Sequence, residues 1–319
     1  MTLTLSTVLG DHGQTAALKS GVVGVAGAEL AFEAFKRMPD AYRIQARTAK
    51  FDVCELAPTT YLVARAAGTP ITALPIPMTR RFRHAGVVRR ADSPIREPKD
   101  LEGRRVGIRA YTVTAGTWTR GVLAEEYGLD TGKVQWFTEE EENVPDVALP
   151  PNVTRVEGRR LADLFAAGDL DAGFAGLAGI GEPGEGESFI DLFENPAPLE
   201  AAWFRKTGIY PIHGLITVRD EVLAANPGLA PALMDAFVAA KRVYLDGVFS
   251  GALDGAEDKR YRKLAAVVGD PLPYGFSANR ASLEALVRMS ENQGFVSGLP
   301  PLEELFLPIE APAYQTEEA

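Results

Sequence analysis

An apolar segment that leads directly into a cluster of basic residues dominates the pattern of this sequence. Residues 71–77, Ile-Thr-Ala-Leu-Pro-Ile-Pro, are typical of a buried strand that ends near two prolines. Three arginines and one of the three histidines then fall within five positions, namely Arg80, Arg81, Arg83 and His84. We interpret residues 79–90, which continue as a short extended segment, as the edge of an anion site beside a crossover between two lobes. A solvent-exposed basic turn is the alternative, because clustered charges usually face water.

Strand and helix patterns alternate on both sides of this stretch. One example is a strand at 51–56 followed by a helix at 58–67. Such alternation predicts an α/β fold with mainly parallel sheets and helices on both faces. A second extended apolar segment, at 209–218, mirrors the one at 85–88. One outgoing and one returning segment predict a two-lobed clamp, with its ligand between the lobes at the carboxyl ends of the strands.

The length and charge of the chain limit its organisation and its partners. A chain of 319 residues exceeds one ordinary core, which predicts two lobes. We assign residues 1–88 and 214–319 to a discontinuous lobe I and residues 89–213 to lobe II. The net charge of −10 argues against nucleic acid as a partner, so an anionic ligand needs a local basic cluster such as residues 80–84.

The cysteine content and the N-terminal residues bear on compartment. Cys54 is the only cysteine, which excludes an intrachain disulfide and a cysteine-based zinc cage. Residues 1–9 show neither the basic start nor the apolar run of a signal peptide. No stretch approaches the roughly 18 continuous apolar residues of a membrane span. The sequence therefore predicts a cytoplasmic protein without a membrane partner, and a removed leader is the alternative.

A loop of small residues at 110–117 opens a helix that extends to about residue 127. The first N–H groups of a helix have no partner within it, so such a loop is suited to anion binding. The loop lacks the Gly-Lys-Ser/Thr of a phosphate loop. We expect Tyr111, Thr112 and Thr114 to line the ligand pocket.

An ordered set of motifs extends over nearly the whole chain. It comprises Phe51-Asp52-Val53-Cys54-Glu55-Leu56, Arg81-Phe82-Arg83-His84, Gly103-Arg104-Arg105-Val106-Gly107, Thr114-Ala115 with Trp118 and Arg120-Gly121, Tyr210-Pro211-Ile212, Pro273-Tyr274-Gly275 with Asn279-Arg280, and Glu303-Glu304-Leu305-Phe306. This set resembles the 4,5-dihydroxyphthalate decarboxylase family. The resemblance implies a type II periplasmic-binding-protein-like fold converted into a cytoplasmic enzyme of aromatic compound metabolism. It implies a carboxy-lyase without cofactor or metal, acting on a hydroxylated aromatic or related cyclic carboxylic acid.

Two departures from the family bear on the substrate. In the family, the strand matching residues 171–175 is followed by Pro-Arg-Ala-Pro, whereas this chain has Gly176-Leu177-Ala178-Gly179. The missing arginine could pair with one of two phthalate carboxylates, so its loss argues against a dicarboxylate. The family histidine after Pro-Ile falls one place later than His213. In a strand one place reverses the side chain, so either a bulge restores its direction or the two histidines are not equivalent.

Decarboxylation of a hydroxylated ring needs a proton donor near the carbon that carries the carboxylate, and donors that hold the carboxylate. We predict His84 as the acid, since histidine titrates near neutral pH, with Arg81 and Arg83 holding the carboxylate. A hydrogen-bonded structural histidine at the lobe crossing is the alternative. Glu55 could accept a ring hydroxyl proton, or it could simply stabilise the N-terminus of the helix near Pro58.

Further candidates are expected around this pair. Asp11 and His12 lie in the loop after the first strand, where they either contact the ligand or are merely exposed. Phe82, Trp118 and Tyr274 could stack on an aromatic ring, and plain core packing is the alternative. A metal held by His84, Glu55 and His213 is a weaker possibility, because no close ligand spacing such as His-x-x-x-His supports it.

Two other functions remain open at this level. One is a non-catalytic binding protein for a small organic anion that feeds a transporter. The other is an enzyme of the same fold with different proton chemistry, such as a lyase or isomerase of a biosynthetic pathway. In each case the partner is a small carboxylate-like molecule, and a homo-oligomer is an open alternative to a monomer.

Overall fold

The computed structural model describes residues 2–184 and 188–315, which divide into two compact units. Unit 1 takes the described residues up to Arg81, those from Thr207 to Glu284 and those from Gly298 onward. Unit 2 takes Phe82–Lys206 and Ala285–Ser297. The chain therefore passes between the units four times.

The unit boundaries differ from those expected at 88/89 and 213/214. Residues 87–89 belong to unit 2 because they form a strand that pairs with two other strands of that unit. Ile212 belongs to unit 1 because it pairs with Arg80. The return of residues 285–297 to unit 2 was not expected from the sequence.

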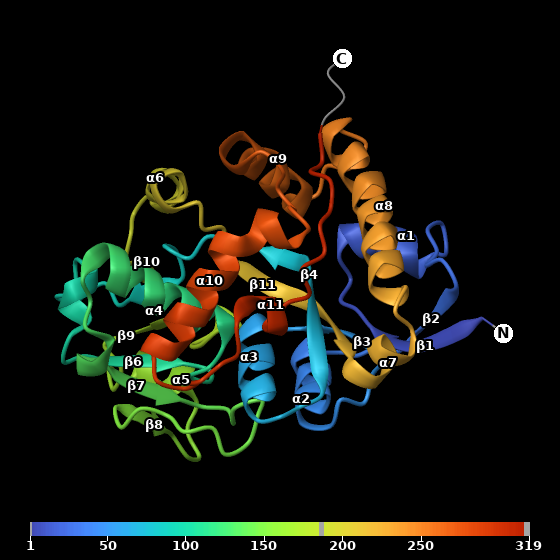
Figure 1. Ribbon diagram of the computed structural model, residues 1–319. Helices are drawn as coiled ribbons and strands as arrows, with labels where there is room; N and C mark the ends of the chain where they lie inside the picture. The colour runs from blue at the N-terminus through green and yellow to red at the C-terminus, as the bar shows by residue number, and fades with distance from the viewer. Residues whose placement is uncertain (1, 185–187, 316–319) are drawn as a thin grey trace. The chain divides into compact units, whose positions relative to one another are not determined.

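Unit 1 is built on a five-stranded sheet in the order β2-β1-β3-β11-β4 (Figure 1). Its strands are β1 (Leu3–Val8), β2 (Ala28–Phe32), β3 (Val53–Leu56), β4 (Ile71–Arg80) and β11 (Ile212–Arg219). Its helices are α1 (Gly13–Lys19), α2 (Met38–Thr48), α3 (Pro58–Ala66), α7 (Asp220–Ala225), α8 (Leu229–Phe249), α9 (Ala256–Val268), the first part of α10 (Phe276–Asn292), and α11 (Leu302–Leu305). The pairs β1–β2 and β1–β3 are parallel, whereas β11 runs antiparallel to both β3 and β4.

Apolar side chains on both faces of this sheet account for its helical layers. The larger core joins β4 and β11 to α1 and α8, and includes Ile76, Ile216 and Phe237. A smaller core on the other face joins β1 and β3 to α2 through Val8, Ala41, Phe51 and Cys54. Successive side chains of a strand point to opposite faces, so neighbouring residues such as Val53 and Cys54 of β3 belong to different cores.

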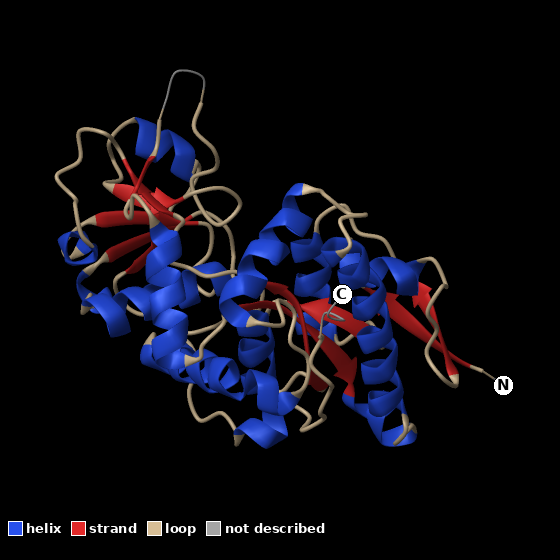
Figure 2. Cartoon of the chain, turned by 90° about the horizontal axis from the view of Figure 1, so that it is seen from above, coloured by secondary structure: helices blue, strands red, loops and turns tan. Residues whose placement is uncertain are grey.

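Unit 2 is built on a six-stranded sheet in the order β10-β5-β9-β6-β7-β8. Its strands are β5 (Val87–Arg89), β6 (Arg105–Ile108), β7 (Gln135–Thr138), β8 (Val153–Arg155), β9 (Ala172–Phe174) and β10 (Ile190–Asp191). Its helices are the 3₁₀ helices η1 (Pro98–Leu101) and η2 (Thr131–Lys133), and the α-helices α4 (Thr114–Tyr127), α5 (Leu161–Ala166) and α6 (Pro196–Thr207). Figure 2 shows strands flanked by helices in this unit as in the other.

The second part of α10 packs closely on α4 within unit 2. A Cβ atom on Gly121 would lie 2.2 Å from Sδ of Met289, so glycine is needed for the approach. Arg288 adds an ion pair to Glu125 at 3.0 Å. This packing explains why residues 285–297 join unit 2.

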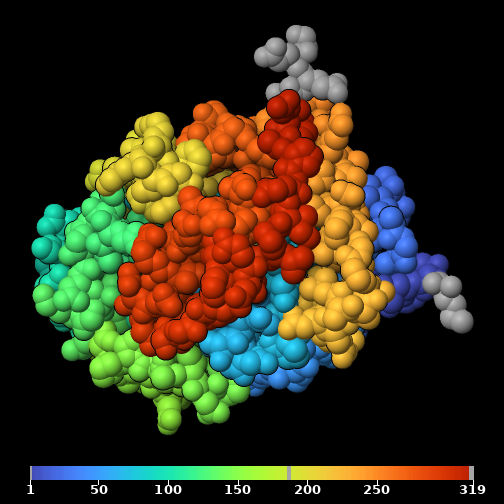
Figure 3. All heavy atoms as spheres, in the orientation of Figure 1, coloured from blue at the N-terminus to red at the C-terminus, as the bar shows by residue number. Residues whose placement is uncertain are grey.

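The C-terminal segment of unit 1 runs along α8 at the surface, as Figure 3 shows in red beside orange. Tyr314 stacks on Phe249 with the ring centroids 5.6 Å apart, and its hydroxyl donates to Asp246 at 2.9 Å. The backbone N–H of Tyr314 also donates to Asp270 at 2.9 Å. Three contacts thus hold the last described residues to this unit.

None of the helices within residues 2–184 and 188–315 is both long and apolar enough to cross a membrane.

Candidate functional site

The topology of unit 1 brings several polar residues to one edge of its sheet. Because β11 is antiparallel to both β3 and β4, these two strands run in the same direction, and β1 is parallel to β3. The carboxyl ends of β1, β3 and β4 therefore share an edge. Gly10–His12 follow β1, Glu55 lies near the end of β3, and Arg80 ends β4. Ligands of α/β sheets usually bind at such an edge.

Glu55 is the centre of this cluster. Its side chain is only 3% exposed, and its carboxylate accepts hydrogen bonds from three groups. The backbone N–H of Gly10 donates at 2.8 Å, Nε2 of His12 contacts Oε2 at 2.9 Å, and the hydroxyl of Tyr42 donates to Oε1 at 3.2 Å. A buried carboxylate requires such donors, because an isolated charge in the interior is very costly.

Two glycines leave the space that this carboxylate occupies. A Cβ atom on Gly10 would lie 2.9 Å from Oε2 of Glu55 and 2.6 Å from Nε2 of His12. A Cβ atom on Gly214 would lie 2.8 Å from Oε1 of Glu55. Side chains at either position would displace the pair, so the sequence is adapted locally to hold it.

The two partners adjust each other's protonation. Burial lowers the pKa of His12, but the charge and hydrogen bond of Glu55 outweigh it, so the pKa of His12 is raised above 6.5. Burial raises the pKa of Glu55, but His12 together with Gly10 and Tyr42 outweighs it, and the pKa falls below 4.5. The charges of Lys19 and Glu257 also act on His12, in opposite directions. Both shifts therefore favour the charged forms, an imidazolium and a carboxylate, over those of the separate side chains.

This pair should give the protein a characteristic pH dependence of stability. The pKa of Glu55 is lower in the folded state, so its contribution is lost as the pH falls below 4.5. The pKa of His12 is higher in the folded state, so its contribution is lost as the pH rises above 6.5. We therefore expect Glu55→Gln to lower the urea midpoint most between pH 4.5 and pH 6.5. A difference that does not vary with pH would contradict the ion pair.

Other residues predicted for the site also lie in unit 1. Asp11 is almost fully exposed and pairs with Lys19 at 2.5 Å, whereas Arg81 is half-exposed and pairs with Glu257 at 3.6 Å. Tyr274 is 1% exposed in the main core. His213 lies in β11 at an irregularity, since Ile212 pairs with Arg80 and Gly214 with the preceding Thr79. The extra residue is what a bulge at this position produces.

His84 lies in unit 2 and is surrounded by aromatic rings. Its ring centroid is 5.7 Å from Trp203, 6.0 Å from Phe193 and 6.1 Å from Tyr127. The side chain is buried, and neither ring nitrogen has a hydrogen-bond partner among the described residues. Burial lowers its pKa to about 4, so the ring is neutral at pH 7. Glu200 accepts hydrogen bonds from the backbone of His84 and Ala85, which fixes the segment.

The remaining candidates are also in unit 2. Phe82 contacts the rings of Trp203 and Phe204, and Trp118 is fully buried in α4. Arg83 is half-buried, and its charge acts on the carboxylate of Glu200. The structure thus unites Glu55 with His12, and it assigns His84, Phe82 and Arg83 to the other unit.

A carboxylate of the chain itself binds the loop before α4. Glu142 accepts from the backbone N–H groups of Tyr111 and Thr112 at 2.6 and 3.0 Å, and from the hydroxyl of Thr112. Thr114 is the first residue of α4 and is buried. The anion-binding geometry expected of this loop is present, with an internal anion in it.

Sequence reasoning missed Tyr42, Gly10, Gly214 and Glu142. Tyr42 lies in the first turns of α2, and nothing in its local pattern marks it as a partner of Glu55. The glycines could have been noted because Gly214 follows the predicted site residue His213 and Gly10 lies two positions before His12. Glu142 falls in an acidic stretch, residues 139–142, whose composition is typical of a solvent-exposed connection.

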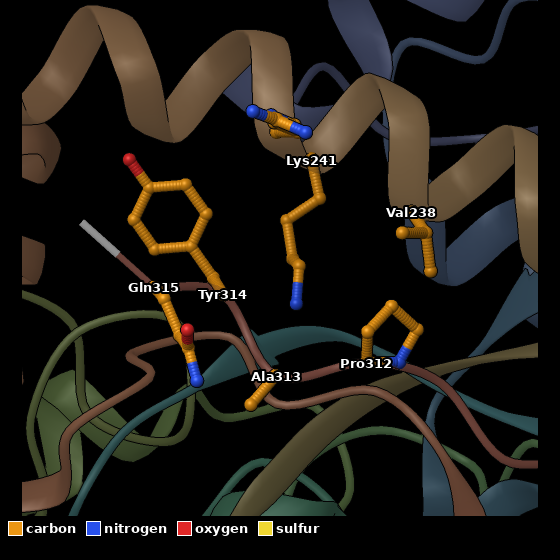
Figure 4. A pocket seen from close by; sticks show the side chains of 7 residues that line it. Val238, Lys241, Pro312, Ala313, Tyr314 and Gln315 are labelled. Atoms are coloured by element: carbon orange, nitrogen blue, oxygen red, sulfur yellow. The ribbon is translucent and has the colours of Figure 1, made fainter. Parts of the chain in front are cut away.

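A cavity of about 310 Å³ lies between α8 and the C-terminal segment of unit 1. Its lining residues are Val238, Lys241, Arg242, Pro312, Ala313, Tyr314 and Gln315. Figure 4 shows Lys241 extending from α8 toward the segment with Pro312 and Ala313. Its ammonium group is already bound by Asp270 at 2.9 Å and by the carbonyl of Leu272 at 3.1 Å. Within the described ranges, no three His, Cys, Asp or Glu residues form a group able to hold a metal ion.

Comparison with known proteins identifies the family. Over 325 aligned residues the chain is 32% identical to a 4,5-dihydroxyphthalate decarboxylase of Comamonas testosteroni, covering 96% of this chain and 97% of that relative. The chain belongs to the 4,5-dihydroxyphthalate decarboxylase family. The resemblance found in its motifs is confirmed. Residues 43–145 of this family member also match a family described as NMT1/THI5 like.

Solved structures similar to this decarboxylase-family chain confirm the predicted periplasmic-binding-protein-like α/β fold. The periplasmic aliphatic sulphonate binding protein SsuA from Escherichia coli has a TM-score of 0.52 at 14% identity, covering 99% of this chain and 96% of that chain. The desulfurization enzyme DSZB has a TM-score of 0.52 at 17% identity, covering 96% of each chain. At this identity the likeness concerns the fold alone, and the fold occurs in both a binding protein and an enzyme.

Proposed function

We propose that this family member is a cofactor-independent decarboxylase of a hydroxylated aromatic or related cyclic carboxylic acid, with His12 as the proton donor. The proposal is supported by the decarboxylase relative at 32% identity. The observation that carries it is the His12–Glu55 pair at the carboxyl edge of the unit 1 sheet. A protonated imidazole held by a buried carboxylate is the acid that the reaction needs.

His12 meets the requirements of the acid better than His84. Its pKa is raised, and a quarter of its side chain remains exposed and can meet a ligand. The pKa of His84 is lowered to about 4, so almost none of it carries a proton at pH 7. The proposal therefore moves the acid from His84, the first candidate from the sequence, to His12.

The reaction can be written as a balanced sequence. His12 gives its proton to the ring carbon that carries the carboxylate, while the ring hydroxyl becomes a carbonyl and releases its own proton to solvent. The bond between that carbon and the carboxylate then breaks, CO₂ leaves, the electron pair restores the aromatic ring as a phenolate, and the phenolate takes a proton back from solvent. The net change is uptake of one proton and loss of CO₂. Solvent can reprotonate His12 because its side chain is partly exposed.

Glu55 and Tyr42 support this step without touching the ring. Glu55 stabilises the imidazolium before transfer and fixes the direction of the ring through its contact with Nε2. Burial, and then the charge of Glu55, raise the pKa of Tyr42 well above 10, so its hydroxyl stays a donor to Glu55. Donors of this kind keep a catalytic pair in place.

The segment at residues 176–181 favours a monocarboxylate in this proposal. Gly176 adopts a positive φ of 63°, and a Cβ atom on Gly179 would lie 2.5 Å from the carbonyl oxygen of Phe174. The family's Pro-Arg-Ala-Pro does not fit this glycine-dependent turn. The chain thus lacks the arginine that could pair with a second carboxylate. The local backbone conformation also requires glycine at positions where the family has proline.

Release of CO₂ from a panel of hydroxybenzoates and hydroxyphthalates tests the proposal. We expect turnover of at least one para- or ortho-hydroxylated acid, with monocarboxylates preferred, and no turnover of benzoate, which has no ring hydroxyl to take up electrons. Tight binding of a panel member without CO₂ release would show a binding protein and contradict the enzyme. Turnover of benzoate would contradict the mechanism.

A further inference from the structure

Arg80 carries hydrogen-bond donors that have no acceptor inside unit 1. The residue is 1% exposed, its Nη1 donates to the carbonyl of Tyr210 at 2.6 Å, and its guanidinium lies 4.7 Å from the centre of the Tyr210 ring. Its Nε and Nη2 are buried and make no hydrogen bond within residues 2–184 and 188–315. No carboxylate of these residues lies within ion-pair distance of it.

A second buried arginine shows that this arrangement is not required by the fold. Arg120 of unit 2 is fully buried and lies 4.0 Å from the centre of a tyrosine ring, that of Tyr111. Its Nε donates to Oε1 of Gln293 at 2.7 Å and its Nη2 donates to the carbonyl of Tyr111 at 2.6 Å, while its Nη1 is buried without an acceptor among the described residues. The Nε and Nη2 donors therefore have protein acceptors in Arg120, whereas the same two donors have none in Arg80.

The Nε–Nη2 edge of Arg80 has a specific chemical shape. Nε and Nη2 form a planar fork that matches the two oxygens of a carboxylate in a bidentate pair. Buried donors without an acceptor are rare in native proteins and call for an explanation outside the chain. A carboxylate would satisfy both donors and also compensate the buried positive charge, whereas a water molecule would not compensate the charge.

Tyr274 offers a further donor nearby. Its hydroxyl is buried without a hydrogen-bond partner in the described part of the chain, and the side chain is 1% exposed. Burial raises the pKa of Tyr274 well above 10, so the hydroxyl keeps its proton. The charge of Arg80 acts on Tyr274 and the reverse also holds, so the two side chains share one environment.

The sheet places this fork on the same face as the His12–Glu55 pair. Glu55 is two residues after Val53 in β3, so it points to the same face as Val53, which belongs to the main core cluster together with Tyr274. The pairing of β4 with β11 is irregular at Met78, so the face of Arg80 is given by its neighbour Tyr274, on which the charges of both Glu55 and Arg80 act. A ligand on Arg80 would therefore lie on the face, and at the edge, that carry the proposed proton donor.

We propose that the Nε–Nη2 edge of Arg80 binds the carboxylate of the cyclic acid, with the Tyr274 hydroxyl as an additional donor. The identity of the acid rests on the proposed function; the assignment of its receptor rests on the geometry of Arg80. Arg80 then replaces Arg81 and Arg83 as the residue that holds the carboxylate, and the substrate is an anion bound by one bidentate pair.

Calorimetric titration of the full-length protein with benzoate, and with benzamide as its neutral counterpart, tests the assignment without relying on turnover. We expect benzoate to bind more tightly than benzamide, and Arg80→Lys, which keeps the charge but loses the fork, to weaken benzoate binding by about 10–100-fold. Arg120→Lys is the matched control, with the same substitution and burial, and should leave benzoate affinity unchanged. Equal affinity for the two probes, no binding of benzoate, or unchanged affinity in Arg80→Lys would overturn the proposal.

A crystal structure with 4-bromobenzoate covers the case in which Arg80→Lys does not fold. We expect the bromine signal beside Arg80 and carboxylate oxygens about 2.8 Å from Nε and Nη2. Density for water alone at the fork, or bromine elsewhere, would refute the receptor. Carboxylate binding at Arg80 without CO₂ release from the panel would leave the receptor intact and contradict only the decarboxylase. CO₂ release with an unchanged KM in Arg80→Lys would contradict the receptor and leave the decarboxylase intact.

Discussion

Replacement of His12 by asparagine is expected to lower kcat/KM for CO₂ release by about 10²–10⁴-fold, the range for loss of a general acid. Asparagine can still donate a hydrogen bond to Glu55, but it cannot carry a transferable proton. The fall should appear mainly in kcat, because the carboxylate is held elsewhere in the site. Glu33→Gln, which removes a partly exposed carboxylate paired with Lys50 in the same unit, controls for loss of an ion pair and should retain activity.

The pH profile and a second histidine variant make this prediction specific. Wild-type activity should decline as the pH rises through the pKa of His12, which lies above 6.5, because the acid form is then lost. His84→Phe, which preserves an aromatic ring among Trp203, Phe193 and Tyr127, decides between the two histidines. The larger loss identifies the acid. A larger loss in His84→Phe than in His12→Asn would refute the role of His12.

Replacement of Lys241 by methionine is expected to destabilise the protein by about 3–5 kcal/mol, as breaking a buried ion pair does. The side chains of Lys241 and Asp270 are 1% and 7% exposed and lie 2.9 Å apart. The substitution leaves a buried carboxylate that retains, among the described residues, two backbone donors, from Leu272 and Tyr314. The shift of the urea midpoint at constant m-value measures the effect.

A matched exposed pair separates burial from charge. Lys259 and Asp254 of unit 1 are also 2.9 Å apart, but their side chains are 56% and 60% exposed. Lys259→Met should therefore leave the urea midpoint nearly unchanged, because water already solvates both groups. Adding Asp270→Asn to Lys241→Met should recover part of the lost stability. Equal effects of the two lysine substitutions would show that burial does not matter here.

Much of the fold could be predicted because it is recorded in local patterns. Strands such as 51–56 and helices such as 58–67 follow from apolar spacing and from proline and glycine positions. The partition of α10 could not be predicted, because its sequence reads as one continuous helix whether or not its second half packs against Gly121. A domain boundary inside a regular helix has no local signal.

The site was predicted only in part, for a related reason. Glu55 and His12 were both named, yet their pairing depends on the distance between two strand ends, which the sequence does not contain. The basic cluster behaves as three separate residues: Arg80 is buried, Arg81 is half-exposed, and Arg83 lies in the other unit. The residue types alone predict the same environment for these neighbouring arginines. The strand end and the unit boundary place them in different environments.

The two separate stretches that form unit 2 limit how this protein can be dissected. An expression clone covering only residues 82–206 would omit Met289 and Gln293, which fill the space over Gly121 and accept from Arg120. Such a fragment would expose apolar surface and leave the buried guanidinium of Arg120 without its acceptor Gln293. It should therefore be insoluble or lack fixed tertiary packing. A permuted gene that joins residues 285–297 to the start or end of 82–206 by a linker would be the smallest design able to fold alone.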